Sequence, residues 1–123
     1  HMEPEFDISG LASAAGASFV ARGTAYHATQ LSSLMKKAVK NKGFSVVEVL
    51  SDCPTYFGRK NRIPDPVDML HWQDEHTYTA AEAKKKDPEE LRGKWLRGVI
   101  KDDPRPEYTD RYKEIIEAAG GLK

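Results

Sequence analysis

The chain is 123 residues long, which suits one compact domain or part of one. Lys plus Arg and Asp plus Glu both number 19, so no net charge draws the chain to nucleic acid or to an acidic membrane. No run approaches the roughly 18 apolar residues of a membrane span, and no signal peptide is recognisable. We therefore expect a cytoplasmic protein without a membrane span or a nucleic-acid partner.

Two local features limit the chemistry further. The opening His1-Met2 is typical of the remnant of a cleaved expression tag, so we expect the chain to begin within a longer protein. The single cysteine, Cys53, excludes an internal disulfide and a zinc or iron–sulfur site built from this chain alone, because such sites usually need about four protein ligands. If Cys53 binds a metal, the other ligands come from elsewhere.

The first half of the chain has the pattern of a strand–helix–strand unit. Asp7 is typical of a helix cap, and the apolar residues after it predict a short helix that ends at Gly16. A short strand is expected over 17–22, followed by an amphipathic helix over 27–41. The nearly continuous apolar run 44–51 is typical of a strand buried on both faces. A crossover of this length joins parallel strands, so the sequence predicts an α/β fold.

The second half of the chain has shorter, more polar elements. Residues 53–64 predict an irregular loop at the carboxyl end of the second strand, where open α/β sheets bind ligands. The elements expected after it are a helix over 65–76 with Val67, Met69 and Leu70 facing inward, a short helix from Asp87, an edge strand over 95–101 and a final amphipathic helix over 108–119.

Cys53 allows more than one interpretation. A lone cysteine at a strand end is often a small, buried apolar side chain. Cys53 and Arg59 are also separated by five residues, the spacing of the phosphate-binding loop in cysteine phosphatases. Against that hypothesis, Pro54 removes a backbone donor, and Pro64 and Pro66 delay the helix that would lower the thiol pKa.

A further interpretation comes from a family resemblance carried by several motifs. They are Gly16–Arg22 (GASFVAR), His27 with Gln30-Leu31, Lys42–Leu50 (KGFSVVEVL), Cys53-Pro54-Thr55, Phe57-Gly58-Arg59 with Asn61, Glu3 with Phe6-Asp7, and Arg105–Tyr108 (RPEY). Together they resemble the second half of the thiamine-diphosphate domain in β subunits of 2-oxoacid:ferredoxin oxidoreductases, of the 2-oxoglutarate kind. The resemblance covers nearly the whole chain. The amino-terminal half of such a subunit has no counterpart in it, so a carboxyl-terminal piece is expected.

The resemblance implies a fold, cofactors and site residues. Residues 3–64 would form part of a three-layer thiamine-diphosphate-binding α/β fold with parallel strands, and 65–123 a mostly helical carboxyl-terminal extension packed on the same domain. Thiamine diphosphate, Mg²⁺ and a [4Fe–4S] cluster are implied in the intact enzyme, with none expected on this chain alone. Cys53 corresponds to the last cysteine ligand of the cluster, and Thr55 is expected at the cofactor. The basic run is a candidate docking site for ferredoxin or for a partner subunit, or else a solvated surface: Arg59, Lys60 and Arg62.

The implied activity is the oxidative decarboxylation of a 2-oxoacid, with acyl-CoA as product and electrons passed to ferredoxin or flavodoxin. The implied partners are an α subunit, further γ and δ subunits, the electron carrier, the 2-oxoacid and coenzyme A. No catalytic residue is assigned to this chain, which is expected to be inactive alone and to self-associate through uncovered sheet edges. A cysteine phosphatase-like domain and a non-enzymatic α/β interaction module are the alternatives.

Overall fold

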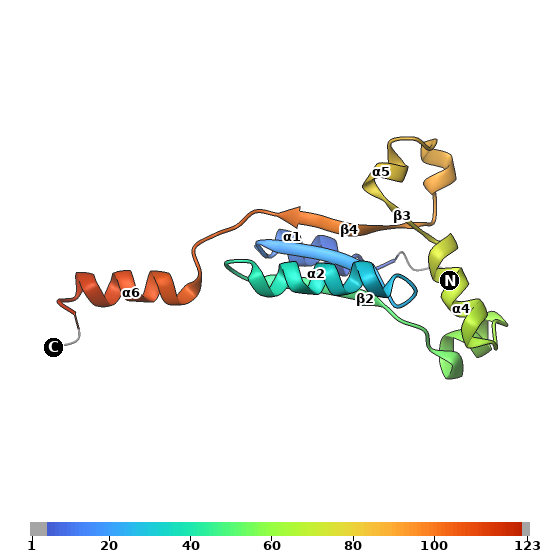
Figure 1. Cartoon of the computed structure of the whole chain (residues 1–123), viewed down its shortest axis with the longest axis horizontal. Helices are drawn as coiled ribbons and strands as arrows, with labels where there is room; N and C mark the ends of the chain where they lie inside the picture. The colour runs from blue at the N-terminus through green and yellow to red at the C-terminus, as the bar shows by residue number, and fades with distance from the viewer. Residues whose placement is uncertain (1–4, 122–123) are drawn as a thin grey trace.

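The computed structural model describes residues 5–121 and shows a four-stranded mixed sheet with helices around it (Figure 1). The strands are β1 (Phe19–Thr24), β2 (Ser45–Leu50), β3 (Thr77–Thr79) and β4 (Trp95–Asp102), in the order β2-β1-β4-β3. β1 pairs in parallel with β2 and antiparallel with β4. The predicted α/β class is confirmed. The possible tag remnant and Glu3 of the family motif lie outside the described residues.

The strand–helix–strand unit forms the centre of the molecule. Helices α1 (Ile8–Ala14) and α2 (Ala28–Lys40) both contact β1 and β2. On one face of β1, Phe19 and Ala21 pack against Leu34 of α2. On the other face, Arg22 reaches Asp7, the residue that caps α1. Because successive strand residues point to opposite faces, α1 and α2 cover opposite sides of the sheet and give three layers.

Arg22 is the centre of a largely buried polar network beneath α1. Its Nε lies 2.8 Å from Glu48 of β2, and one terminal nitrogen lies 3.0 Å from Asp7. The hydroxyl of Ser9 donates to the same Glu48 carboxylate. A buried guanidinium needs such partners, because an unpaired charge in the interior costs several kcal/mol. This network joins the start of α1 to the two parallel strands.

Two strands differ from the sequence prediction in their surroundings. β2 is half-buried rather than buried on both faces, because within residues 5–121 it lies at the edge of the sheet with one side unpaired. β4 was expected at an edge, and this prediction was wrong: it lies between β1 and β3. The three-residue strand β3 and the four-residue helix α5 (Ala80–Ala83) were not predicted.

The remaining elements follow the chain on either side of β4. Cys53 is followed by one π-helical turn, η1 (Pro54–Gly58), a short α3 (Arg59–Asn61) and α4 (Pro66–Glu75). In α4, Met69 is buried as predicted, Leu70 is half-buried, and Val67 is exposed, contrary to prediction. The 3₁₀ turn η2 (Pro88–Leu91) precedes β4, and α6 (Tyr108–Ala118) follows it. Every helix within residues 5–121 is too short or too polar to span a bilayer.

Candidate functional site

The candidate site lies at the carboxyl ends of β1 and β2. The backbone N–H of Ala25, just after β1, donates to the carbonyl of Leu50 at the end of β2 and holds the two ends together at 2.9 Å. Cys53 follows Leu50 by three residues. Ligands of open α/β sheets bind at this end of parallel strands. The site predicted from the sequence is therefore at the expected edge of the sheet.

Cys53 is exposed and sits at the start of a helical turn, not in an irregular loop. Pro54 occupies the first position of η1, where no N–H is needed, and Gly58 N donates to the Cys53 carbonyl at 3.0 Å. The predicted delay of helical structure until Pro66 was therefore wrong. The exposed sulfur also excludes the interpretation of Cys53 as a buried apolar side chain.

The turn stabilises the thiolate form of Cys53. The backbone N–H of Phe57, then that of Tyr56, donate hydrogen bonds that lower the pKa of the Cys53 thiol, and the Thr55 hydroxyl adds to the effect. Thr55 Oγ1 lies 3.8 Å from the sulfur. The thiolate is the form of cysteine that binds metals and attacks electrophiles. The structure therefore places the Thr55 hydroxyl next to the Cys53 sulfur, in a turn that favours the thiolate.

The basic residues after Cys53 form an exposed cluster on α3 and its end. Arg59 and Lys60 belong to α3, and Arg62 ends it with a left-handed φ of 60°. Within residues 5–121 none of the three forms an ion pair, and Lys60 Nζ lies 4.5 Å above the Tyr56 ring. A phosphate-binding loop would use the cysteine and the arginine together. No hydrogen bond between described residues joins Arg59 to Cys53. None of the three cations is therefore paired with an acidic side chain within the described residues, although Lys60 contacts Tyr56.

A cavity of about 320 Å³ opens at the carboxyl end of β2, with Asp52 but not Cys53 in its lining, and the sequence did not predict it. Its lining comes from the end of β2, from η1, from α4 and from the start of β4: Val49, Leu50, Ser51, Asp52, Phe57, Met69, Trp72, Gln73 and Trp95. Trp72 packs against both Phe57 and Trp95, with ring centroids 5.0 and 5.7 Å apart. Only a fold that brings together residues far apart in sequence creates such a cavity, so composition and spacing gave no signal.

α4 is fastened to the β1–α2 junction by two polar contacts. Gln73 Oε1 accepts from Tyr26 N at 3.1 Å, and Asp74 lies 3.0 Å from His27 Nε2. The other ring nitrogen of His27 is 2.8 Å from the hydroxyl of the fully buried Thr24. Burial, and next the positive charge of Arg97, lower the pKa of His27, so the neutral imidazole is favoured. His27 was predicted to start its helix or to pack; it also ties α2 to α4.

The described residues do not form a metal site by themselves. Among residues 5–121 no group of three or more His, Cys, Asp or Glu side chains converges on one point. An exposed thiolate with backbone N–H donors is a suitable single ligand for an iron–sulfur cluster, whose potential depends on hydrogen bonds to sulfur. The donor set therefore fits a cluster shared with other cysteines, rather than one held by this stretch of chain alone.

The fold and the site define an α/β protein with an exposed cysteine and a short basic helix at the carboxyl ends of parallel strands. No family model matches the chain. The 2-oxoglutarate synthase subunit KorB of Methanothermobacter marburgensis is 50% identical over 120 residues, which cover 98% of this chain and 42% of that protein. The subunit of the same name from Methanothermobacter thermautotrophicus is 42% identical over the same shares. The 2-oxoacid:ferredoxin oxidoreductase subunit beta of Saccharolobus solfataricus is 33% identical over 82% of this chain and 31% of its own.

A solved structure shares the fold. A chain of the 2-oxoglutarate:ferredoxin oxidoreductase from Magnetococcus marinus, solved with 2-oxoglutarate, coenzyme A and succinyl-CoA, matches with a TM-score of 0.75 at 22% identity, over 98% of this chain and 42% of that one. The chain is thus related over nearly its whole length to β subunits of 2-oxoacid:ferredoxin oxidoreductases, and it spans less than half the length of these relatives. The family resemblance seen in the motifs is confirmed, and it is favoured over the phosphatase and interaction-module alternatives.

Proposed function

We propose that this chain is part of the β subunit of a 2-oxoglutarate:ferredoxin oxidoreductase, which converts 2-oxoglutarate and coenzyme A to succinyl-CoA and carbon dioxide and passes two electrons to ferredoxin. The observation that carries the proposal is the 50% identity over 98% of the chain to a 2-oxoglutarate synthase subunit. Thiamine diphosphate with Mg²⁺, implied by the family resemblance, would supply the carbon chemistry when bound. The chain itself would supply one wall of the cofactor domain.

Within this function, Cys53 would be one cysteine ligand of a [4Fe–4S] cluster, with Thr55 beside it at the cofactor. The proposal is supported by the exposed sulfur at the carboxyl end of β2 and by the lowered pKa of the thiol. A ligand thiolate must be deprotonated, and donors to sulfur tune the cluster potential. The remaining ligands would come from the part of the subunit that the relatives have and this chain does not span. Residues 3–64 would belong to the cofactor domain and 65–123 to its extension, in a cytoplasmic complex with an α subunit.

The complete assembly, with this chain in its full-length β subunit, gives a direct test. Ferredoxin reduction should require both 2-oxoglutarate and coenzyme A. Pyruvate in place of 2-oxoglutarate is the matched control for the substrate, and it should give much slower reduction. An assembly that carries its cofactors but fails to reduce ferredoxin with either 2-oxoglutarate or pyruvate would overturn the proposal.

The basic cluster of Arg59, Lys60 and Arg62 would dock the acidic electron carrier near the iron–sulfur cluster. The support is its position within nine residues of Cys53 and its freedom from ion pairs within residues 5–121. Changing all three residues to Glu should raise the KM for ferredoxin by about tenfold at low salt and by less at high salt, because the attraction is screened. The exposed run Lys84–Lys86, changed in the same way, is the control and should leave the KM unaltered. Equal effects of the two triple variants would exclude a specific docking role.

A further inference from the structure

The turn that carries Cys53 has no hydrogen bond to the sheet among the described residues. The last bond on this side runs from Ala25 N to the carbonyl of Leu50, at the end of β2. Beyond it the chain leaves β2 as an extended segment and forms η1 beside α4 (Figure 1). Within residues 5–121, the hydrogen bonds of residues 51–64 join only atoms of that segment. The position of Cys53 relative to the parallel strands therefore depends on what the turn packs against.

The turn packs against α4. The Sδ and Cε atoms of the buried Met69 lie 2.9 and 3.2 Å from the point that a Cβ on Gly58 would occupy. Next to this contact, the ring centroids of Phe57 and Trp72 are 5.0 Å apart. Close-packed groups transmit a displacement, because the space between them cannot be compressed. A shift of α4 would therefore shift the turn.

Side chains near the end of α4 hold it to the end of β1. Asp74 lies 3.0 Å from Nε2 of His27, and the neighbouring Gln73 accepts a hydrogen bond from Tyr26 N. The other ring nitrogen of His27 is 2.8 Å from the hydroxyl of Thr24, the last residue of β1. A continuous set of contacts thus runs from β1 through His27 and Asp74 to α4, and from α4 to the turn.

A hydroxyl, an imidazole and a carboxylate in this sequence are also the parts of a hydrolase triad. Here Thr24 is fully buried, so its oxygen cannot reach a substrate, and it already accepts a hydrogen bond from His27 N at 3.2 Å. Burial, and next Arg97, lower the pKa of His27. The neutral ring can accept from the Thr24 hydroxyl at Nδ1 and donate from Nε2 to Asp74. The three residues therefore join structural elements and do not form a reactive site.

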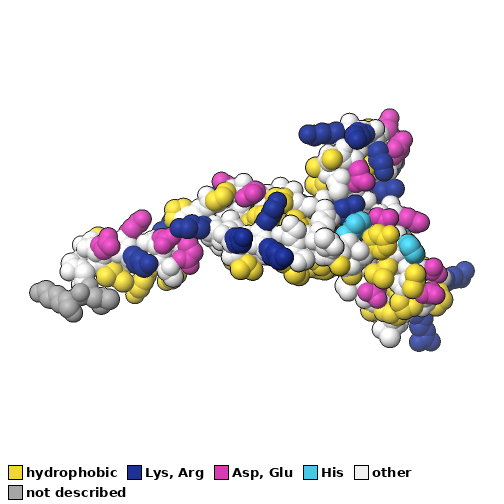
Figure 2. Space-filling view, viewed as in Figure 1, with side chains coloured by type: hydrophobic (Ala, Val, Ile, Leu, Met, Phe, Trp, Pro, Cys, Tyr) yellow, Lys and Arg dark blue, Asp and Glu magenta, His cyan; other side chains and the backbone are white. Residues whose placement is uncertain are grey.

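We propose that His27 and Asp74 are positioning residues for Cys53: their contact holds α4, and through α4 the turn η1, in a fixed place beside the carboxyl ends of β1 and β2. Figure 2 shows histidine side chains (cyan) where the body of the molecule meets the part that holds α4 and β3. The inference rests on the proposed function, in which Cys53 is a cluster ligand and its fellow ligands come from outside this chain. Such a ligand must be held in place by its own surroundings.

Hydrogen exchange of the complete assembly, followed by mass spectrometry, tests the proposal on the turn itself. Asp74→Ala removes the acceptor for Nε2–H of His27. The amides of residues 55–58 should then exchange about tenfold faster, because a loosened α4 lets the turn open more often. Asp74→Asn keeps an acceptor and should restore most of the protection. The amides of β1 and β2 should exchange at an unaltered rate in both variants, which a general loss of stability would not produce.

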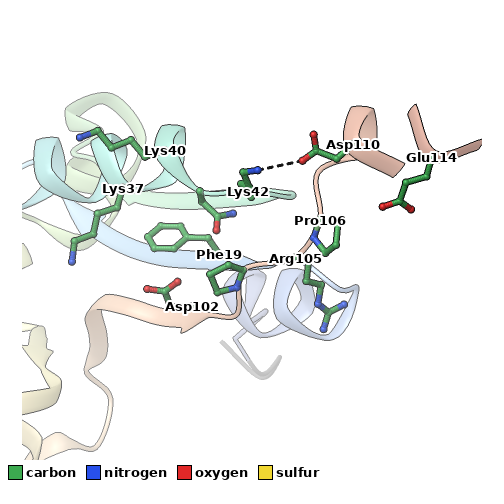
Figure 3. Close-up of a pocket in the computed structure, with 11 residues that line it drawn as sticks. Phe19, Lys37, Lys40, Lys42, Asp102, Arg105, Pro106, Asp110 and Glu114 are labelled. Carbon is green, nitrogen blue, oxygen red and sulfur yellow. Dashed lines mark hydrogen bonds and ion pairs between the residues drawn. The ribbon is translucent and has the colours of Figure 1, made fainter. Parts of the chain in front are cut away.

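Asp110→Ala is the matched control at the other end of the sheet. The Asp110 carboxylate lies 3.3 Å from Lys42 Nζ, in a groove that also contains Phe19, the first residue of β1 (Figure 3). The side chains of Asp110 and Asp74 are 43% and 46% exposed, so the two substitutions remove similar contacts. Asp110→Ala should leave the exchange of residues 55–58 unaltered. Equal acceleration by the two alanine variants, or none by Asp74→Ala, overturns the proposal.

A second variant tests the same contact from its other side. His27 is the residue before the first turn of α2, a position that asparagine suits. His27→Asn is too short to reach Asp74 and should also accelerate the exchange of residues 55–58. This variant decides the outcome if Asp74→Ala fails to assemble, and unaltered exchange in it would contradict the positioning role.

Iron release gives a further readout in the same assemblies. A chelator should remove iron about tenfold faster from the Asp74→Ala assembly, as is common when an outer support of a metal ligand is lost, and Asp74→Asn should largely reverse this. Cys53→Ser separates the inference from the proposed function. If Cys53→Ser loses a cluster while Asp74→Ala changes neither exchange nor iron release, only the positioning role is refuted. If Cys53→Ser keeps every cluster, the ligand role of Cys53 is refuted, and the positioning role is refuted with it.

Discussion

Gly58 closes the turn that follows Cys53, and its replacement by alanine tests how firmly that turn is held. Gly58 has an ordinary φ of −60°, so Gly58→Ala creates no backbone strain. The added Cβ would lie 2.5 Å from the carbonyl oxygen of Ile63 and 2.9 Å from Sδ of Met69. The thioether can move, but the carbonyl cannot move without the turn. Overpacking of this kind typically costs about 1–3 kcal/mol, and we expect a loss of that size in the free energy of unfolding.

The same substitution should change the chemistry of Cys53. A displaced turn moves the N–H groups of Phe57 and Tyr56 away from the sulfur, so the pKa of the thiol should rise toward its ordinary value. The pH dependence of alkylation by iodoacetamide measures this pKa, because only the thiolate reacts. In the double variant Gly58→Ala/Met69→Ala the clash with Ile63 remains, so the pKa should stay raised. An unaltered thiol pKa in the single variant would refute the role assigned to the turn.

Two further predictions concern the polar contacts that hold the site in place. Glu48→Gln should lower the free energy of unfolding by about 3–5 kcal/mol, because it removes the carboxylate charge closest to the largely buried Arg22. Asp7→Asn, at the exposed end of the network, should cost about 1 kcal/mol or less. Denaturant titration of the two variants measures this difference, and equal losses would contradict it. Burial holds the pKa of His27 below 6.5 in the folded protein, so the unfolded chain binds a proton first as the pH falls. The free energy of unfolding should therefore decrease below about pH 6.5, and His27→Gln should flatten that part of the profile.

Local patterns predicted the central unit of the fold well. The helix expected over 27–41 is α2 (Ala28–Lys40), and the strand expected over 44–51 is β2 (Ser45–Leu50). Both have a strong periodicity or a continuous apolar run, so the local signal agrees with the tertiary structure. The parallel pairing of β1 with β2 followed from the length of the crossover.

Features that depend on distant residues were not predictable in the same way. β3 is three residues long and exists because it pairs with β4. The position of β4 beside β1 depends on a chain reversal that no local pattern specifies. The contact between His27 and Asp74 likewise joins residues that lie 47 positions apart in the sequence. Neither residue has a local sequence pattern that indicates this contact.

The turn after Cys53 shows a different limit. The prolines and polar residues near it suggested irregular backbone, yet Pro54 fits the first position of a helical turn. The N–H groups that reach the sulfur come from Tyr56 and Phe57, which the turn brings back toward Cys53. The candidate residues themselves, Cys53 and Thr55, were predicted from the sequence because the family motif contains them.

Cys53→Ser in the complete assembly tests the central claim most directly, by iron content, cluster absorbance and thiamine content measured on the same preparation. We expect thiamine diphosphate to remain bound while one [4Fe–4S] cluster is lost and electron transfer to ferredoxin stops. Full iron content with normal ferredoxin reduction in this variant would contradict the assignment of Cys53 as a cluster ligand.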